Sequence, residues 1–152
     1  MRVVVQRVQQ AEVAVAGTGV AAIGPGLLVL AGFEAADEAA DLAWMVGKLL
    51  RLRIFPDAQG VMNRNVQECG GEILAVSQFT LYASTRKGNR PSWSRAAPGP
   101  LSQPLFAGFV AQLAAGLGKA VPTGSFGADM AGSLVNHGPV PLVLASRDPA
   151  HG

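Results

Sequence analysis

The sequence is poor in the residues that build most enzyme active sites. It contains one cysteine, Cys69, and two histidines, His137 and His151. A single cysteine excludes an internal disulfide framework and fits a reducing compartment. No His, Cys or carboxylate cluster has the spacing of metal ligands, so we expect no metal site. No nucleophile-elbow pattern surrounds any serine, so a Ser-His-Asp triad is not expected either.

Long apolar runs and charged residues are also scarce. The longest apolar run, 26–33, is too short to cross a bilayer, and the stretch 1–7 carries charge and lacks a cleavage signal. We therefore expect a cytoplasmic protein with no membrane partner. Charged residues make up 14% of the chain and hydrophobic residues 49%. This balance predicts apolar surface covered by a second copy, although an Ala- and Gly-rich composition also lowers the charge.

Acidic residues are absent from one part of the chain. The range 73–128 has no Asp or Glu and holds five cations, Arg86, Lys87, Arg90, Arg95 and Lys119. A one-sided basic surface suits a polyanionic partner such as a nucleic acid. The alternative is a solvated basic loop, and charge alone leaves both open.

Apolar periodicity predicts one mixed domain over 1–152, with two helices on a mostly β body. Helices are expected from a cap at Asp37 to about Arg51, and from Leu105 to Leu117. The range 84–100, rich in Pro, Gly and cations, is expected to be a loop. Strands are expected in two parts of 3–15, at 27–30 and 72–82, and near 124–126, 133–136 and 140–145.

Two segments combine features that suit a binding site. Ser77, Gln78, Phe79 and Thr80 end an apolar strand, where backbone N–H groups could form an oxyanion hole and Thr80 could hold a water or substrate hydroxyl. The alternative is an ordinary strand end with alternating polar residues. The segment 136–140 contains a Gly-Pro step, which is either a plain turn or a rigid backbone tip presented to a ligand.

A third segment, 84–93, combines cations, hydroxyl groups and Trp93. Phosphate contact with base or ribose stacking on Trp93 is one reading. The other places Trp93 at the edge of the core, with the cations in water.

From Met1 to about Ser146 the chain resembles the D-aminoacyl-tRNA deacylase family. The matching stretches are 1–8, 23–30, 52–55, 77–83, 85–92, Thr123, 126–130, Asn136 and 138–140. The resemblance implies a three-layer α/β fold that forms a two-fold homodimer, with a site at each subunit boundary. It also implies hydrolysis of the ester that joins a D-amino acid to the terminal adenosine of tRNA, and removal of glycine from mischarged tRNA.

The resemblance also implies roles for individual residues. Ser77 to Thr80 line the catalytic pocket. Gly138 and Pro139 are joined by a cis bond and enter the partner's pocket, where their carbonyls hold the substrate amino group and exclude an L side chain. Arg7 helps to fix that loop. No metal or organic cofactor is implied, and the partner is the acceptor end of an aminoacyl-tRNA rather than DNA.

Arg86, Lys87 and Arg90 are expected to bind tRNA rather than take part in the chemistry. The chain departs from the family where His137 replaces an acid and Pro141 replaces Thr. Pro141 lacks a backbone N–H, so a ladder bond at that position is lost. Two rival classes stay open: a non-catalytic tRNA- or RNA-binding dimeric module, and a dimeric scaffold.

Overall fold

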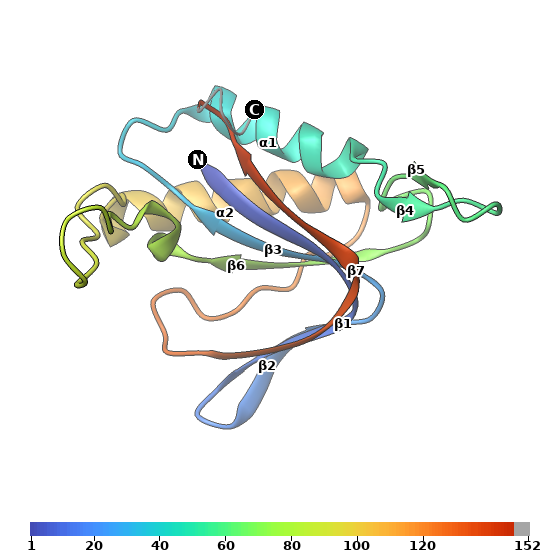
Figure 1. Cartoon of the computed structure of the whole chain (residues 1–152), viewed down its shortest axis with the longest axis horizontal. Helices are drawn as coiled ribbons and strands as arrows, with labels where there is room; N and C mark the ends of the chain where they lie inside the picture. The colour runs from blue at the N-terminus through green and yellow to red at the C-terminus, as the bar shows by residue number, and fades with distance from the viewer. Residues whose placement is uncertain (148–152) are drawn as a thin grey trace.

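The structure, a computed structural model, describes residues 1–147, and of Pro139 it describes the backbone. Its central element is the long strand β1 (Arg2–Val15). One edge of β1 pairs antiparallel first with β3 (Gly26–Gly32) and then with β2 (Thr18–Ile23). The other edge pairs antiparallel with β7 (Ala131–Ala145), and β6 (Glu72–Ser77) lies parallel to β3. Figure 1 shows β1 and β7 curving together along the sheet.

The strand predictions were right in place and wrong in extent. The two strands expected in 3–15 are one strand, and the strands expected at 133–136 and 140–145 are both parts of β7. No strand forms at 124–126; within the described chain, its neighbour Thr123 makes an isolated bridge with Ala75. A small hairpin, β4 (Phe55–Pro56) with β5 (Met62–Arg64), projects from the end of α1 (Figure 1).

Helices α1 (Ala39–Arg51) and α2 (Gly99–Leu117) lie on the same side of the sheet (Figure 1). The predicted cap at Asp37 was wrong, because Glu38 caps α1 through a capping box with Asp41. Helix α2 begins at Gly99 rather than Leu105, because Pro100 is tolerated in a first turn. Neither helix is long and apolar enough to span a membrane, and the same holds for the rest of residues 1–147.

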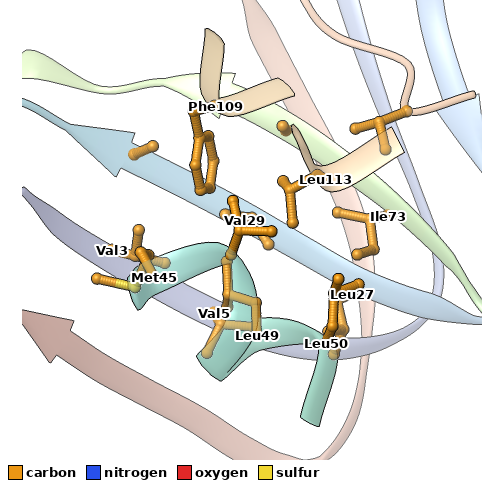
Figure 2. Packing of buried hydrophobic residues seen from close by; sticks show 14 of the residues in the cluster. Val3, Val5, Leu27, Val29, Met45, Leu49, Leu50, Ile73, Phe109 and Leu113 are labelled. Carbon is orange, nitrogen blue, oxygen red and sulfur yellow. The ribbon is translucent and has the colours of Figure 1, made fainter. Parts of the chain in front are cut away.

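The main core lies between these helices and one face of the sheet. Figure 2 shows side chains of β1, β3 and β6 directed at side chains of both helices. Each fully buried aliphatic or aromatic side chain here stabilises the fold by ~1.5–3 kcal/mol. The cluster includes Val3, Val5, Leu27, Val29, Met45, Leu49, Ile73, Phe109 and Leu113.

The opposite face of the sheet carries a second, smaller apolar cluster. It consists of Val8, Ala11, Val13, Ile23, Leu28, Leu74 and Val76. In residues 1–147, both helices belong to the first cluster, so neither covers this face. The mixed α/β fold with two helices is confirmed, whereas a third layer stays an expectation for two assembled chains.

Candidate active site

A hollow of about 700 Å³ opens at the end of β6, between the helix-free face of the sheet and the start of α2, which contributes Gly99 and Ser102 to its lining. Leu28, Leu30 and Val76 supply apolar walls, and Gln6 and Ser77 supply polar groups. Pockets for small molecules commonly combine a largely apolar lining with a few placed polar groups. The hollow therefore has the size and character of a site for a small organic group.

The polar segment after β6 turns at the hollow. A strand was expected to continue to Tyr82, but β6 ends at Ser77, and Phe79–Tyr82 form a 3₁₀-helix, η1. The Gln78 N–H donates to the Ala31 carbonyl at 2.7 Å. A Cβ on Gly32 would lie 2.8 Å from the Gln78 carbonyl oxygen, so a glycine is needed where η1 packs against β3.

The four expected catalytic residues are brought together but do different things. Ser77, Gln78 and Phe79 line the hollow. The Thr80 hydroxyl accepts a hydrogen bond from Gln78 Nε2 at 2.6 Å, so it holds the amide that faces the hollow. The N–H groups of Phe79 and Thr80 have no acceptor within η1, because the first donors of a helix lack a partner inside it.

Two exposed aromatic rings form one side of the hollow. Phe79 and Trp93 both line it, with ring centroids 5.3 Å apart and planes at 82°. Phe79 is 53% exposed and Trp93 is 41% exposed, so neither ring belongs to a core cluster. The Trp93 ring is therefore accessible, and its stacking on a base or ribose stays a prediction.

The three cations expected to bind tRNA lie on a loop that leaves the site just after η1. Paired hydrogen bonds between the backbones of Ser84 and Ser92, at 2.8 and 3.0 Å, close this loop. Arg86, Lys87 and Arg90 are all exposed along it. None of them is among the described residues that line the hollow, and their contact with tRNA stays a prediction.

The Gly-Pro step lies in a bulge of β7. Gln6 pairs with Pro141 and Val8 with Asn136, so the residues 137–140 stand opposite the single residue Arg7. A Cβ on Gly138 would lie 2.3 Å from the Val140 nitrogen. Only glycine fits at 138 without a rearrangement of the bulge, and the side chain of Pro139 lies outside the described part of the structure.

Arg7 holds the base of this bulge. Its side chain is 9% exposed, its Nε donates to the His137 carbonyl at 2.7 Å, and its Nη1 donates to the Ile54 carbonyl at 2.6 Å. Charge-assisted hydrogen bonds of this kind are roughly twice as strong as neutral ones. Arg7 therefore contacts the backbone beside the Gly-Pro step, and its role in fixing that loop for a substrate stays a prediction. The contact uses a backbone oxygen, so the replacement of an acid by His137 leaves it intact.

The hollow also contains polar residues that sequence reasoning did not single out. Gln6 and Glu12 reach it from β1, and Asp129 reaches it from the segment before β7. Gln6 was detectable, because it is the one polar residue between Val3 and Arg7 in a strand with period-2 burial. Glu12 and Asp129 carried no local signal.

An ionic cluster surrounds the start of β1, away from the hollow. The Met1 ammonium lies 2.5 Å from Asp37 Oδ1, with both side-chain groups fully buried. Burial, followed by the charges of Asp37 and Glu34, raises the pKa of nearby Tyr82, so its phenol stays neutral. Across residues 1–147, no three His, Cys, Asp or Glu side chains are grouped to hold a metal ion.

Comparison with known proteins identifies the family. The family model D-Tyr-tRNA(Tyr) deacylase matches residues 4–145. The chain is 68% identical to a D-aminoacyl-tRNA deacylase of Dechloromonas aromatica, covering 98% of this chain and 99% of that protein. It is 61% identical to a D-aminoacyl-tRNA deacylase of Chromobacterium violaceum, with the same coverage of both chains.

Solved structures agree with the fold. A structure titled c-Myc DNA Unwinding Element Binding Protein superposes with a TM-score of 0.90 at 38% identity, covering 97% of this chain and 100% of that one. A probable eukaryotic D-amino acid tRNA deacylase superposes with a TM-score of 0.80 at 22% identity, covering 94% and 97%, which supports the fold alone. The chain therefore belongs to the D-Tyr-tRNA(Tyr) deacylase family, a family of hydrolases.

Proposed function

We propose that this protein hydrolyses the ester bond of D-aminoacyl-tRNA and rejects L-aminoacyl-tRNA, as a chiral proofreading step of translation in the cytoplasm. The observation that carries the proposal is the bulge 137–140, which Arg7 fixes by its hydrogen bond to the His137 carbonyl. A fixed backbone tip can distinguish enantiomers by steric exclusion, whereas D and L substrates offer the same functional groups to any flexible site.

The chemistry needs few ionisable side chains. A water attacks the ester carbonyl carbon, the carbonyl oxygen becomes an oxyanion, and the bond to the ribose oxygen then breaks as that oxygen takes a proton. The N–H groups of Phe79 and Thr80 are the donors available for the oxyanion at the end of β6. Such donors act at about 2.7–3.1 Å from the oxyanion. A neighbouring hydroxyl of the substrate ribose, held close to the ester by binding, assists the reaction in place of a protein side chain.

The site is shared between two subunits in this proposal. Of the described residues of the bulge, none lines the hollow of its own chain, so the tip has to enter another hollow to meet a substrate. The helix-free face is suited to a second copy, because β7 exposes Leu134 and Val143 there. In residues 1–147, β7 pairs only with β1, which leaves one long edge open.

Glycine on mischarged tRNA should also be a substrate. Exclusion acts on the side chain of the L enantiomer, and glycine has none to exclude. The basic loop 84–92 supplies affinity for the tRNA acceptor end through phosphate contacts. A non-catalytic RNA-binding module would need that loop but would not need a fixed bulge.

Mixed dimers test the shared site. One subunit carries Gly138→Ala, which disturbs the tip, and the other carries Ser77→Phe, which fills the hollow. Differently tagged chains are co-expressed, and the mixed dimer is isolated by two affinity steps. Each homodimeric variant is expected to be inactive on D-tyrosyl-tRNA.

The mixed dimer then contains one hollow and one tip that are both intact, on different subunits. Activity near half that of the wild type is expected, because that pair forms a complete site. An inactive mixed dimer would show that tip and hollow act within one chain. A monomeric mass by light scattering at micromolar concentration would likewise remove the shared site.

A further inference from the structure

Arg2 is fixed at the first position of β1. Its backbone pairs with Gly32 of β3 on one side and with Ala145 of β7 on the other. The preceding Met1 ammonium donates to Asp37 Oδ1 at 2.5 Å and to Ser146 Oγ at 2.9 Å. The backbone that carries the Arg2 side chain is therefore held from three directions.

The Arg2 side chain reaches the end of η1 that lies away from Phe79. Its Nη1 donates to the Leu81 carbonyl at 2.8 Å. Its guanidinium carbon lies 4.9 Å from the centre of the Tyr82 ring. The last carbonyls of a helix have no partner within it, so a charged donor there satisfies a group that the helix cannot.

We propose that Arg2 is a positioning residue for the hydrolysis, and that it sets the placement of η1 and through it that of Phe79 and Thr80. The inference rests on the proposed function. Helix η1 is a single turn of four residues, so its two ends move together. At its start, Gln78 is tied to β3 through the Ala31 carbonyl, and at its end Arg2 ties Leu81 to β1. Loss of the second tie leaves Leu81 held by its packing against Gly32 and by the buried Tyr82 ring, without the hydrogen bond from β1.

A small hollow of about 250 Å³ beside Tyr82 offers a different reading of Arg2. Arg2, Arg95 and Arg147 all line it, and three guanidinium groups could bind a phosphate. Each of these groups is engaged within the chain, however: Arg95 with Glu34 at 3.2 Å, Arg147 with Asp37 at 2.7 Å, and Arg2 with Leu81. The contacts therefore favour a positioning role over an anion site.

Arg2→Met tests the role, because it keeps an apolar stem and removes the donor. Single-turnover hydrolysis of D-tyrosyl-tRNA at saturating enzyme should slow by about tenfold, since displacements near 1 Å at a reacting centre can reduce rates by up to about a hundredfold. The Kd for tRNA should stay within about twofold. Arg2→Lys retains a cationic donor but loses the planar guanidinium that lies over the Tyr82 ring, and it should recover part of the rate.

Arg95→Met is the matched control. Its guanidinium carbon lies 5.6 Å from the centre of the same Tyr82 ring, but its hydrogen bond goes to Glu34 rather than to η1. The single-turnover rate of this variant should stay within about twofold of the wild-type rate. A loss equal to that of Arg2→Met would overturn the assignment.

Amide hydrogen exchange provides a readout that does not depend on activity. The N–H groups of Leu81 and Ala83 donate to Gln78 and Thr80 within the turn. In Arg2→Met their exchange should accelerate, while exchange in α1 and β3 stays at wild-type rates. Uniform acceleration throughout the chain would mean a general loss of stability, and would overturn a positioning role.

The outcomes separate the two proposals. An unchanged rate, or weaker tRNA binding at an unchanged rate, overturns the positioning role; the second result would assign the small hollow to phosphate. If the wild type itself fails to hydrolyse D-tyrosyl-tRNA, the proposed function fails. Exchange at Leu81 and Ala83 would then still decide whether Arg2 fixes η1.

Discussion

The two faces of the sheet differ in what covers them. On one face, helices α1 and α2 enclose a large apolar cluster that includes Phe109 and Leu49. On the other face, a smaller cluster that includes Leu28 and Val76 lines a hollow of about 700 Å³. The chain closes the first face with its own helices and leaves the second accessible. The closed face therefore carries most of the folding energy, and the open face is the one available for a ligand and a second copy.

Strand β1 contributes side chains to both faces of the sheet, because successive side chains of a strand point to opposite sides. Val3 and Val5 point into the helix-covered cluster, whereas Val8 belongs to the open-face cluster and Gln6 reaches the hollow. Arg7, between them, fixes the bulge of β7. One segment of six residues, 3–8, thus contributes to the core, to the hollow and to the tip.

The largest effect should come from the closed face. Phe109→Ala removes a fully buried ring and should lower the free energy of unfolding by ~3–5 kcal/mol. Val61→Ala, on an exposed side chain of the hairpin between β4 and β5, should lower it by less than ~1 kcal/mol. Urea unfolding of the two variants makes the comparison. Equal losses would contradict the assignment of most of the folding energy to the closed face.

The next effect concerns the bulge. Gly138→Ala places a Cβ 2.3 Å from the Val140 nitrogen, so the tip has to move. Activity on D-tyrosyl-tRNA should fall by ~100-fold, because the tip no longer seats the substrate. Gly108→Ala is the control, since its Cβ would make an ordinary contact with Leu42 at 3.6 Å. Wild-type activity in Gly138→Ala would exclude the tip from the site.

The basic loop should change binding without changing the chemistry. Replacement of Arg86, Lys87 and Arg90 by Ala should weaken tRNA binding by roughly tenfold and reduce the salt slope of log K by about 2–3. Filter binding across a salt series measures both quantities. Lys119→Ala serves as the control, because its ammonium is bonded to the Gly70 carbonyl. A collapse of the single-turnover rate at saturating enzyme would instead place these cations in the catalytic machinery.

The smallest effect is a pH dependence on the closed side. Burial tends to raise the pKa of Asp41, but the Ser146 hydroxyl, the Glu38 N–H and the charges of Arg147 and Met1 outweigh it and lower the pKa. A lowered pKa adds stability above the unfolded-state value near 4, and this stability is lost as pH falls through the folded value.

The contribution of Asp41 should be small, because burial opposes the lowering of its pKa by the hydrogen bonds and charges around it. Urea midpoints between pH 3 and 6 should therefore fall less steeply in Asp41→Asn than in the wild type. If the urea midpoints of the two proteins fell with pH at the same slope, Asp41 would contribute nothing to the loss of stability in acid.

Local pattern predicted the elements better than their ends. The spacing of Leu42, Met45 and Leu49 placed α1, and apolar runs placed β1, β3 and β6. The end of β6 could not be predicted, because it depends on where β3 stops and on the close packing of Gly32 against η1. No feature of residues 77–82 alone records that contact.

The site was predictable only where a resemblance supplied long-range pairs. Arg7 and His137 are far apart in sequence, and nothing in either segment indicates their contact. The ties from Arg2 to Leu81 and from Met1 to Asp37 are of the same kind, and sequence reasoning missed both. Such pairs depend on the register of the strands across the sheet. Period-2 alternation predicts which face a side chain points to, but not which residue of another segment lies beside it.

The most direct test is hydrolysis of matched D- and L-tyrosyl-tRNA by the purified protein, without added metal and with EDTA present. The account predicts release of D-tyrosine at a rate at least ~100-fold above that of L-tyrosine, because the Arg7-held tip excludes the L side chain. Equal rates on the two enantiomers, or no release from either, would contradict it.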